Sequence, residues 1–212
     1  MEDVLDVYQR PYNPKRPVVC LDEASKVLHT TPRGALPLAP GKPQRVDYEY
    51  ERHGVANLFL VVQPLGGWRK VRVTDRRTKL DFAEQLRQLA DEDFPDAEII
   101  VLVTDNLNTH GPAALYEAFE PAEARRLATR FEWHFTPEHA SWLNVAECEL
   151  SVLTRQCLTQ DFADKEILGR MVAAWEARRN LMQVTVDWHF TTADARTKLK
   201  RLYPVIKERN LT

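Results

Sequence analysis

Residues 99–104 (IIVLVT) are the apolar run that most constrains how this chain of 212 residues can fold. The run is too short for a helix and does not alternate between apolar and polar positions, so it predicts a strand buried on both faces. It ends at Asp105, and the mostly polar residues 106–110 (NLNTH) follow before Gly111. In an open sheet covered by helices on both faces, ligands bind at the carboxyl ends of the strands. Asp105 is therefore a candidate ligand-binding residue, although an aspartate that only caps the next helix explains the pattern about equally well.

The composition is that of an ordinary globular protein, with 44% hydrophobic residues, 28% charged residues and a formal net charge of −2. No apolar run is long enough to span a membrane, and the acidic first residues differ from a signal peptide. The three cysteines show no C-x-x-C spacing and fit free thiols in a reducing compartment better than a disulfide framework or a zinc site. We therefore expect a cytoplasmic protein, and any DNA contact has to come from local basic patches.

Apolar periodicity predicts the element order βββαβ(αα)βαα. Residues 24–54 are rich in proline and glycine and predict a long loop after the first strand. The other strands are predicted at residues 18–23, 55–63, 68–74 and 131–135. Helices are predicted at residues 79–90, 112–119, 121–130, 142–158 and 164–179, with Ser141 as an N-cap. The chain then divides into an extended lead-in at residues 1–16, one domain at residues 17–180 and a basic C-terminal tail at residues 181–212.

Three acidic residues that lie far apart in the sequence can meet in such a fold. Asp22 ends the first strand, Asp105 ends the central strand, and Glu147 comes early in a late helix. Mg²⁺ prefers oxygen ligands and is usually held by one or two carboxylates together with substrate phosphates. Two such ions about 3.5–4 Å apart assist phosphoryl transfer. The element order is also that of ribonuclease-H-like nucleases, which is an analogy of fold only. Spacing alone does not establish that these three acids form a metal site, because a chain with this many acids contains accidental triads.

Three separated segments resemble the DDE endonuclease domain of bacterial insertion-sequence transposases, specifically the insertion sequence 630 family, which are relatives of the mariner elements. They are residues 19–23 (VCLDE), 104–110 (TDNLNTH) and 136–147 (TPEHASWLNVAE). Residues 47–54 and 150–158 resemble the same family, so the resemblance covers most of residues 17–180. It implies an α/β, ribonuclease-H-like fold of the retroviral integrase superfamily, with a mixed five-stranded sheet flanked by helices. By the family motifs, the catalytic and metal-binding acids are Asp22, Asp105 and Glu147.

The resemblance further implies Mg²⁺ or Mn²⁺ as cofactor, with two ions in the active complex, and DNA as partner. The expected reaction is cleavage at transposon ends and strand transfer into a TA-containing target by a homodimer, in the bacterial cytoplasm at the nucleoid. Two features depart from the mariner-type motif. Val145 stands in place of proline, and the spacing from Asp105 to Glu147 is longer (147 − 105 = 42). Both bear on substrate details more than on the acids. Residues before Val18 leave no room for the family's N-terminal helix-turn-helix, so we expect weak, salt-sensitive DNA binding.

Other candidate residues each have a structural explanation as well. Glu149 is a rival to Glu147, but two positions along a helix turn it to the opposite side, where a solvated acid is the simpler interpretation. Trp133 fits core packing better than base stacking. A basic run from Arg69 to Lys79 fits either a phosphate track or a solvated edge strand. Candidates for supporting the metal acids or contacting DNA are Glu23, Asn106, His110, His139, Trp142, Asn144, Arg72, Arg76, Arg77 and Lys79.

Three classes of function therefore compete. The first is a metal-dependent transposase catalytic domain. The second is a generic ribonuclease-H-like nuclease or resolvase, which would cut hybrids or junctions without joining a 3′-hydroxyl end to target DNA. The third is a non-catalytic DNA-binding remnant of a transposase, and the presence of all three acids argues against it.

Overall fold

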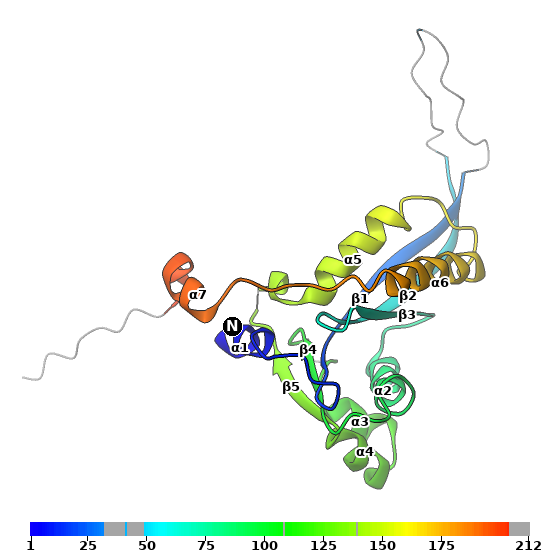
Figure 1. Cartoon of the computed structure of the whole chain (residues 1–212). Coiled ribbons are helices and arrows are strands. Elements are labelled where there is room, and N and C mark those ends of the chain that lie inside the picture. The colour runs from blue at the N-terminus through cyan, green and yellow to red at the C-terminus, as the bar shows by residue number, and fades with distance from the viewer. Residues whose placement is uncertain (32–40, 42–48, 108, 139, 204–212) are drawn as a thin grey trace, which may run out of the picture.

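The computed structural model describes residues 1–31, 41, 49–107, 109–138 and 140–203. Its centre is a five-stranded sheet in the order β3-β2-β1-β4-β5 (Figure 1). β1 pairs antiparallel with β2 and parallel with β4, β2 pairs antiparallel with β3, and β4 pairs parallel with β5. The strands are β1 (Val18–Thr30), β2 (Glu51–Gln63), β3 (Trp68–Thr74), β4 (Ile100–Thr104) and β5 (Phe131–Phe135). This is the mixed sheet of the predicted ribonuclease-H-like fold, and the prediction is confirmed.

Helices flank the sheet in the predicted order from α2 to α6, with one further helix at each end of the chain. They are α1 (Glu2–Tyr8), α2 (Lys79–Gln88), α3 (Ala113–Ala118), α4 (Pro121–Ala128), α5 (Val145–Gln156), α6 (Lys165–Leu181) and α7 (Thr192–Lys198). A π-helical turn follows α2 at Leu89–Asp93, and short 3-10 turns lie at Ser141–Leu143 and Lys200–Leu202. Of the helices that the structure describes, none is long and apolar enough to cross a membrane.

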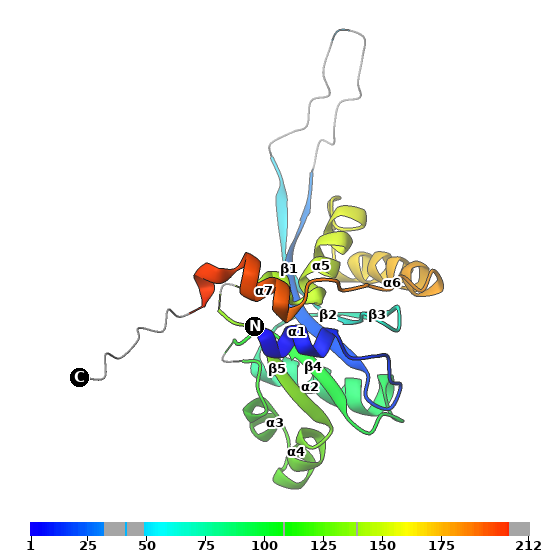
Figure 2. The same ribbon diagram turned by 60° about the vertical axis from the view of Figure 1, so that its left-hand side comes forward.

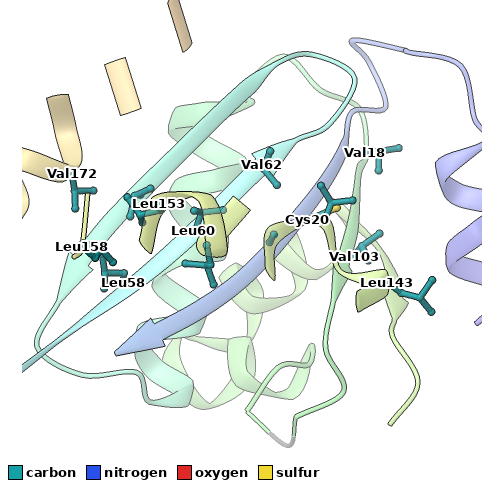
Figure 3. Packing of buried hydrophobic residues seen from close by; sticks show 14 of the residues in the cluster. Val18, Cys20, Leu58, Leu60, Val62, Val103, Leu143, Leu153, Leu158 and Val172 are labelled. Atoms are coloured by element: carbon teal, nitrogen blue, oxygen red, sulfur yellow. The ribbon is translucent and has the colours of Figure 1, made fainter. Parts of the chain in front are cut away.

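Alternation along the strands divides the core between the two faces of the sheet, because successive side chains point to opposite faces. Cys20, Leu60 and Val103 face α1, α5 and α6, where Leu143 and Leu153 join them (Figure 3). The intervening residues of the same strands face α2, α3 and α4 in a second buried cluster. The two helical layers lie on opposite sides of the sheet (Figures 1 and 2).

The first residues of the chain correct one prediction. Residues 1–16 are not extended throughout, because Glu2–Tyr8 forms α1. Val4 and Leu5 of α1 are fully buried, and acidic residues in its first turn suit the positive end of the helix dipole. The prolines that predict an extended segment begin only at Pro11, so their influence does not reach α1.

The prediction of a loop at residues 24–54 is also wrong at both ends of this range. Ala24 to Thr30 continues β1, and Glu51 to Gly54 begins β2. The two strands remain paired out to Thr30 and Glu51, so the hairpin projects beyond the helices (Figures 1 and 2). The central part of the predicted loop lies outside the described residues. Cross-strand hydrogen bonds thus extend strands whose composition alone is typical of a loop.

The C-terminal tail packs on the domain over its described part. In both views α7 lies beside α1 (Figures 1 and 2), where Arg196 forms a two-pronged ion pair with Glu2 at 2.8 Å. Further back along the tail, the backbone of Gln183 lies so close to Gly67 that a Cβ atom on this glycine would come within 2.7 Å of it. Gly67 also has a φ of +64°, a conformation that favours glycine. The tail therefore extends the core on the α5 side of the sheet.

Candidate metal centre

Asp22 and Asp105 occupy matching positions at the carboxyl end of the sheet. In the parallel pairing of β1 with β4, Cys20 lies opposite Val103. Continuing this register by two residues places Asp22 opposite Asp105, which follows the last residue of β4, Thr104. Asp22 shares a face of β1 with Cys20 because side chains alternate along a strand. That face is the one covered by α5.

Asn144 fixes the beginning of α5, and so the position of Glu147 in its first turn, against β1. The buried Asn144 side chain donates from Nδ2 to the Leu21 carbonyl (3.0 Å). Its Oδ1 accepts from the Ala146 N–H (3.1 Å) and thereby caps the helix. The predicted N-cap, Ser141, is therefore wrong, and Asn144 is the N-cap. Residues 141–143 form a 3-10 turn that ends before α5 begins. Asn144 links the helix of one predicted acid to the strand of another.

Negative charge is concentrated where these elements meet. Burial raises the pKa of Asp22 to about 7, the backbone N–H of Glu23 opposes the rise, and the charges of Asp105, Glu23 and Glu147 add to it. Oε2 of Glu147 is buried and has no hydrogen-bond partner among the described residues. Leaving a buried carboxylate oxygen unpaired costs free energy that a bound cation would offset. The donor set therefore fits a divalent cation that prefers oxygen ligands.

The side chains do not stand at ligation distance in this structure. Among the described residues, no group of three or more His, Cys, Asp or Glu side chains is arranged to hold a metal ion. Neighbouring carboxylates repel one another, and Asp105 is turned toward His110. That Asp22, Asp105 and Glu147 bind metal stays a prediction, which the backbone register and the electrostatics support.

His110 connects Asp105 with Glu23. Its Nδ1 contacts Asp105 Oδ1, and its Nε2 lies 2.7 Å from Glu23 Oε2. The ring is buried and stacks on Phe82, with ring centroids 4.5 Å apart and an interplanar angle of 25°. Burial by itself lowers the pKa of His110, but the hydrogen bonds to Asp105 and Glu23 outweigh it and raise the pKa to about 9. Of the residues predicted to support the metal acids, His110 thus contacts Asp105 directly, and Glu23 contacts His110.

An open cavity of about 440 Å³ adjoins Asp105. Trp142, which follows the lining residue Ser141 in sequence, is 41% exposed and stacks on Trp188, with ring centroids 6.4 Å apart and an interplanar angle of 13°. His139, a predicted site residue, lies outside the described residues. The cavity is lined by Asp105, Asn106, Leu107, Thr136, Pro137, Glu138 and Ser141. Asn106 therefore lines a space next to the candidate metal centre, and Trp142 directly follows another lining residue, Ser141.

The basic residues before α2 do not form one set of exposed charges. The side chain of Arg72 is only 14% exposed and is held in an ion pair, whereas Arg76 and Arg77 are exposed. The acidic partners are Asp93 for Arg72, Glu117 for Lys79 and, at 4.0 Å, Glu23 for Arg77. Exposure therefore favours Arg76 and Arg77 over Arg72 as residues that contact DNA.

Glu149 turns away from Glu147, as predicted, but it is not a solvated acid. Its side chain is 5% exposed and lies 3.0 Å from Arg69 Nε and 2.8 Å from Arg179 Nη2. Arg69 is fully buried and also donates to three backbone carbonyl groups, so it belongs neither to a phosphate track nor to a solvated edge. An acid that is buried between two arginines cannot be recognised from helical spacing alone.

Tyr8 lies next to the candidate site as well, although no sequence pattern singles it out. Its hydroxyl donates to the carbonyl of Leu143 (2.6 Å), next to the cap of α5. The apolar spacing of Val4, Leu5, Val7 and Tyr8 indicates a short helix with one buried face, but nothing in it points to a partner 135 residues away.

Comparison with known proteins agrees with this architecture. The family model of the DDE superfamily endonucleases matches residues 17–169. No curated protein matches the chain. A solved Mos1 transposase paired-end complex with left transposon end has a TM-score of 0.55 at 17% identity, over 85% of this chain and 55% of that chain. A Mos1 strand transfer complex has a TM-score of 0.36 at 16% identity, over 85% of this chain and 57% of that chain.

At 17% identity the paired-end complex supports the fold alone, and this chain spans about half the length of that transposase chain. The family match covers all five strands of the sheet, both Asp22 and Asp105, and α5 with Glu147. The predicted family resemblance is thereby confirmed: the chain belongs to the DDE superfamily endonucleases.

Proposed function

We propose that this chain is the catalytic domain of an insertion-sequence transposase that cleaves DNA at the element's ends and transfers the strands to target DNA. The observation that carries the proposal is that the structure joins the three elements on which the three acids lie. Asp22 and Asp105 match in the register of two parallel strands, and Asn144 ties the first turn of α5, with Glu147, to β1. Membership of the endonuclease family and the fold shared with a transposase support it.

In this proposal Asp22, Asp105 and Glu147 hold Mg²⁺ or Mn²⁺, two ions in the active complex. When bound, such ions activate the attacking hydroxyl group and stabilise the leaving oxygen in phosphoryl transfer. The protein places its own groups around that reaction. His110 and Glu23 orient the carboxylate of Asp105, as partners of metal ligands commonly do.

The cavity beside Asp105 receives the substrate phosphate, with Asn106 and Ser141 on its wall. Trp142 offers an exposed ring on which a base of the DNA strand can stack. Arg76 and Arg77 contribute exposed positive charge for the DNA backbone. We further propose that the active complex is a homodimer on paired DNA ends, with a TA-containing target, in the bacterial cytoplasm.

Strand transfer with pre-cleaved DNA ends, in Mg²⁺ and in chelator, tests the function. We expect joining of 3′ ends to target DNA by the wild type in Mg²⁺ only, and a loss of at least about a hundredfold in Glu147→Gln, which removes a ligand charge. Glu120→Gln, which changes an exposed acid before α4, is the matched control and should retain activity. Joining by Glu147→Gln at the wild-type rate contradicts the proposal. Metal-dependent cutting of hybrids or junctions without joining would indicate a generic nuclease or resolvase instead.

A further inference from the structure

The hydroxyl group of Tyr8 lies between the two elements that carry Asp22 and Glu147. It donates to the carbonyl of Leu143 (2.6 Å) and lies 3.4 Å from the N–H of Val145, the first residue of α5. On its other side it lies 3.4 Å from the sulfur of Cys20. One hydroxyl group thus contacts the strand of one acid and the helix start of the other.

Each of these contacts is close in sequence to an acid of the candidate centre. Cys20 precedes Asp22 by two residues on the same face of β1, and Val145 precedes Glu147 by two residues in the first turn of α5. A shift of either backbone at these points moves the neighbouring carboxylate. Figure 3 shows Cys20, Val103 and Leu143 gathered on one side of the buried cluster.

Tyr8 is held firmly in this position. It is 8% exposed, and its ring packs on Trp188 at a centroid distance of 4.8 Å. Burial raises the pKa of Tyr8 well above its ordinary value, so the hydroxyl group stays protonated and can donate. A buried hydroxyl group is costly unless it is hydrogen-bonded, and a phenylalanine would fill the same space without that cost. Packing alone therefore does not explain why a hydroxyl group stands here.

We propose that Tyr8 is a positioning residue that sets the spacing between the Asp22 strand and the Glu147 helix. α1, which lies outside residues 17–169 matched by the family model, is then a working part of the active site. The inference rests on the proposed function in so far as these acids bind metal. The positioning itself can be measured without metal.

Hydrogen–deuterium exchange of the full chain in chelator tests the positioning. Tyr8→Phe keeps the ring and removes only the hydroxyl group, and Tyr12→Phe makes the same change at a residue that is 55% exposed. Losing one buried hydrogen bond should speed exchange of the amides at residues 143–148 by about threefold to tenfold in Tyr8→Phe. Tyr12→Phe should leave them unchanged. Unchanged exchange at residues 143–148 in Tyr8→Phe overturns the inference.

Mn²⁺ binding, measured by calorimetry on the same proteins, tests the consequence for the site. We expect wild type and Tyr12→Phe to bind alike, Tyr8→Phe to bind about tenfold more weakly, as when a partner of a metal ligand is lost, and Glu147→Gln to lose binding. Faster exchange with unchanged Mn²⁺ affinity means that the hydroxyl group serves folding only, and this overturns the inference. If wild type itself binds no Mn²⁺, the proposed function fails, and the exchange result separates that failure from a failure of the positioning.

Discussion

Glu147 and Glu149 belong to the same helix, but they face different surroundings. Glu149 is buried between Arg69 and Arg179, at 3.0 and 2.8 Å, and its charge is fully compensated. The charge of Glu147 contributes to the raised pKa of Asp22, and the buried Oε2 of Glu147 has no hydrogen-bond partner among the described residues. Two positions along one helix separate an acid that holds α5, α6 and β3 together from an acid that is left available for a ligand.

Buried charges are compensated in one region of the fold and not in the other. At the junction of β3, α5 and α6, each buried charge has an opposite charge beside it, as expected for groups that stabilise the frame. At the carboxyl end of the sheet, the charges of Asp105 and Glu147 act on Asp22, and in the described part of the chain the one cationic side chain in contact with these acids is His110, at Asp105. Groups that bind a ligand tolerate such a cost, because the ligand removes it.

The largest effect that we expect is a difference in the free energy of unfolding between variants of these two acids. Glu149→Ala leaves Arg69 and Arg179 buried without their acid and should lower the free energy of unfolding by about 3–5 kcal/mol. Glu147→Ala on the same helix should change it by less than about 1 kcal/mol, or increase it, because it relieves repulsion with Asp22. Urea denaturation measures both variants. Equal losses would remove the distinction on which the comparison rests.

The second prediction concerns stabilisation by metal. A ligand that binds only the native state adds about 2.7 kcal/mol when its free concentration is a hundred times its dissociation constant. We expect Mn²⁺ to stabilise wild type and Glu120→Gln by this amount and Glu147→Gln hardly at all, in denaturation experiments with and without chelator. Stabilisation of Glu147→Gln to the wild-type extent would place the ion elsewhere.

The third prediction is a pH dependence of opposite sign for two acids. Burial raises the pKa of Asp22 to about 7, so the native state binds a proton that the unfolded chain releases, and stability falls as the pH rises from about 4 to 7, by on the order of 2 kcal/mol. For Glu132, burial is outweighed by hydrogen bonds from Arg10 and His134, which lower its pKa to about 2, so its contribution is lost as the pH falls from about 4.5 to 2.

Denaturation of metal-free protein across this pH range checks both directions. Asp22→Asn should flatten the decline between about pH 4 and 7 and leave the acid side as in wild type. Glu132→Gln should do the reverse. A wild-type stability that rises steadily from pH 4 to 7, and is unaffected by Asp22→Asn, is incompatible with an uncompensated Asp22.

The smallest effect concerns two arginines that differ in the same way as the two glutamates. Arg76 is exposed, whereas Arg72 is held by Asp93. Arg76→Ala should weaken binding to duplex DNA and reduce the slope of log K against log salt by about one, because one phosphate contact is lost. Arg72→Ala should leave the slope unchanged. Anisotropy titrations between about 50 and 200 mM salt distinguish the two variants.

Local patterns predict those elements in which each residue's neighbours along the chain decide its environment. The unbroken run at residues 99–104 predicts β4, and the alternation at residues 68–74 predicts β3 with its bounds. The stretch at residues 24–30 does not predict a strand, because its pairing partner lies in residues 51–58. Glu149 cannot be assigned in advance for the same reason, since its arginines come from β3 and α6.

The sequence by itself determined the order of the elements from β1 to α6 and the placement of Asp105 after a strand end and of Glu147 near a helix start, since these follow from short-range periodicity, whereas Asp22 lies within β1 and not at its predicted end. Only the tertiary structure decided that α1 covers the start of α5, that Tyr8 contacts both Cys20 and Leu143, and that Arg69 is buried against Glu149. These contacts join residues distant along the chain, and their energies depend on burial and on partners that no local pattern encodes.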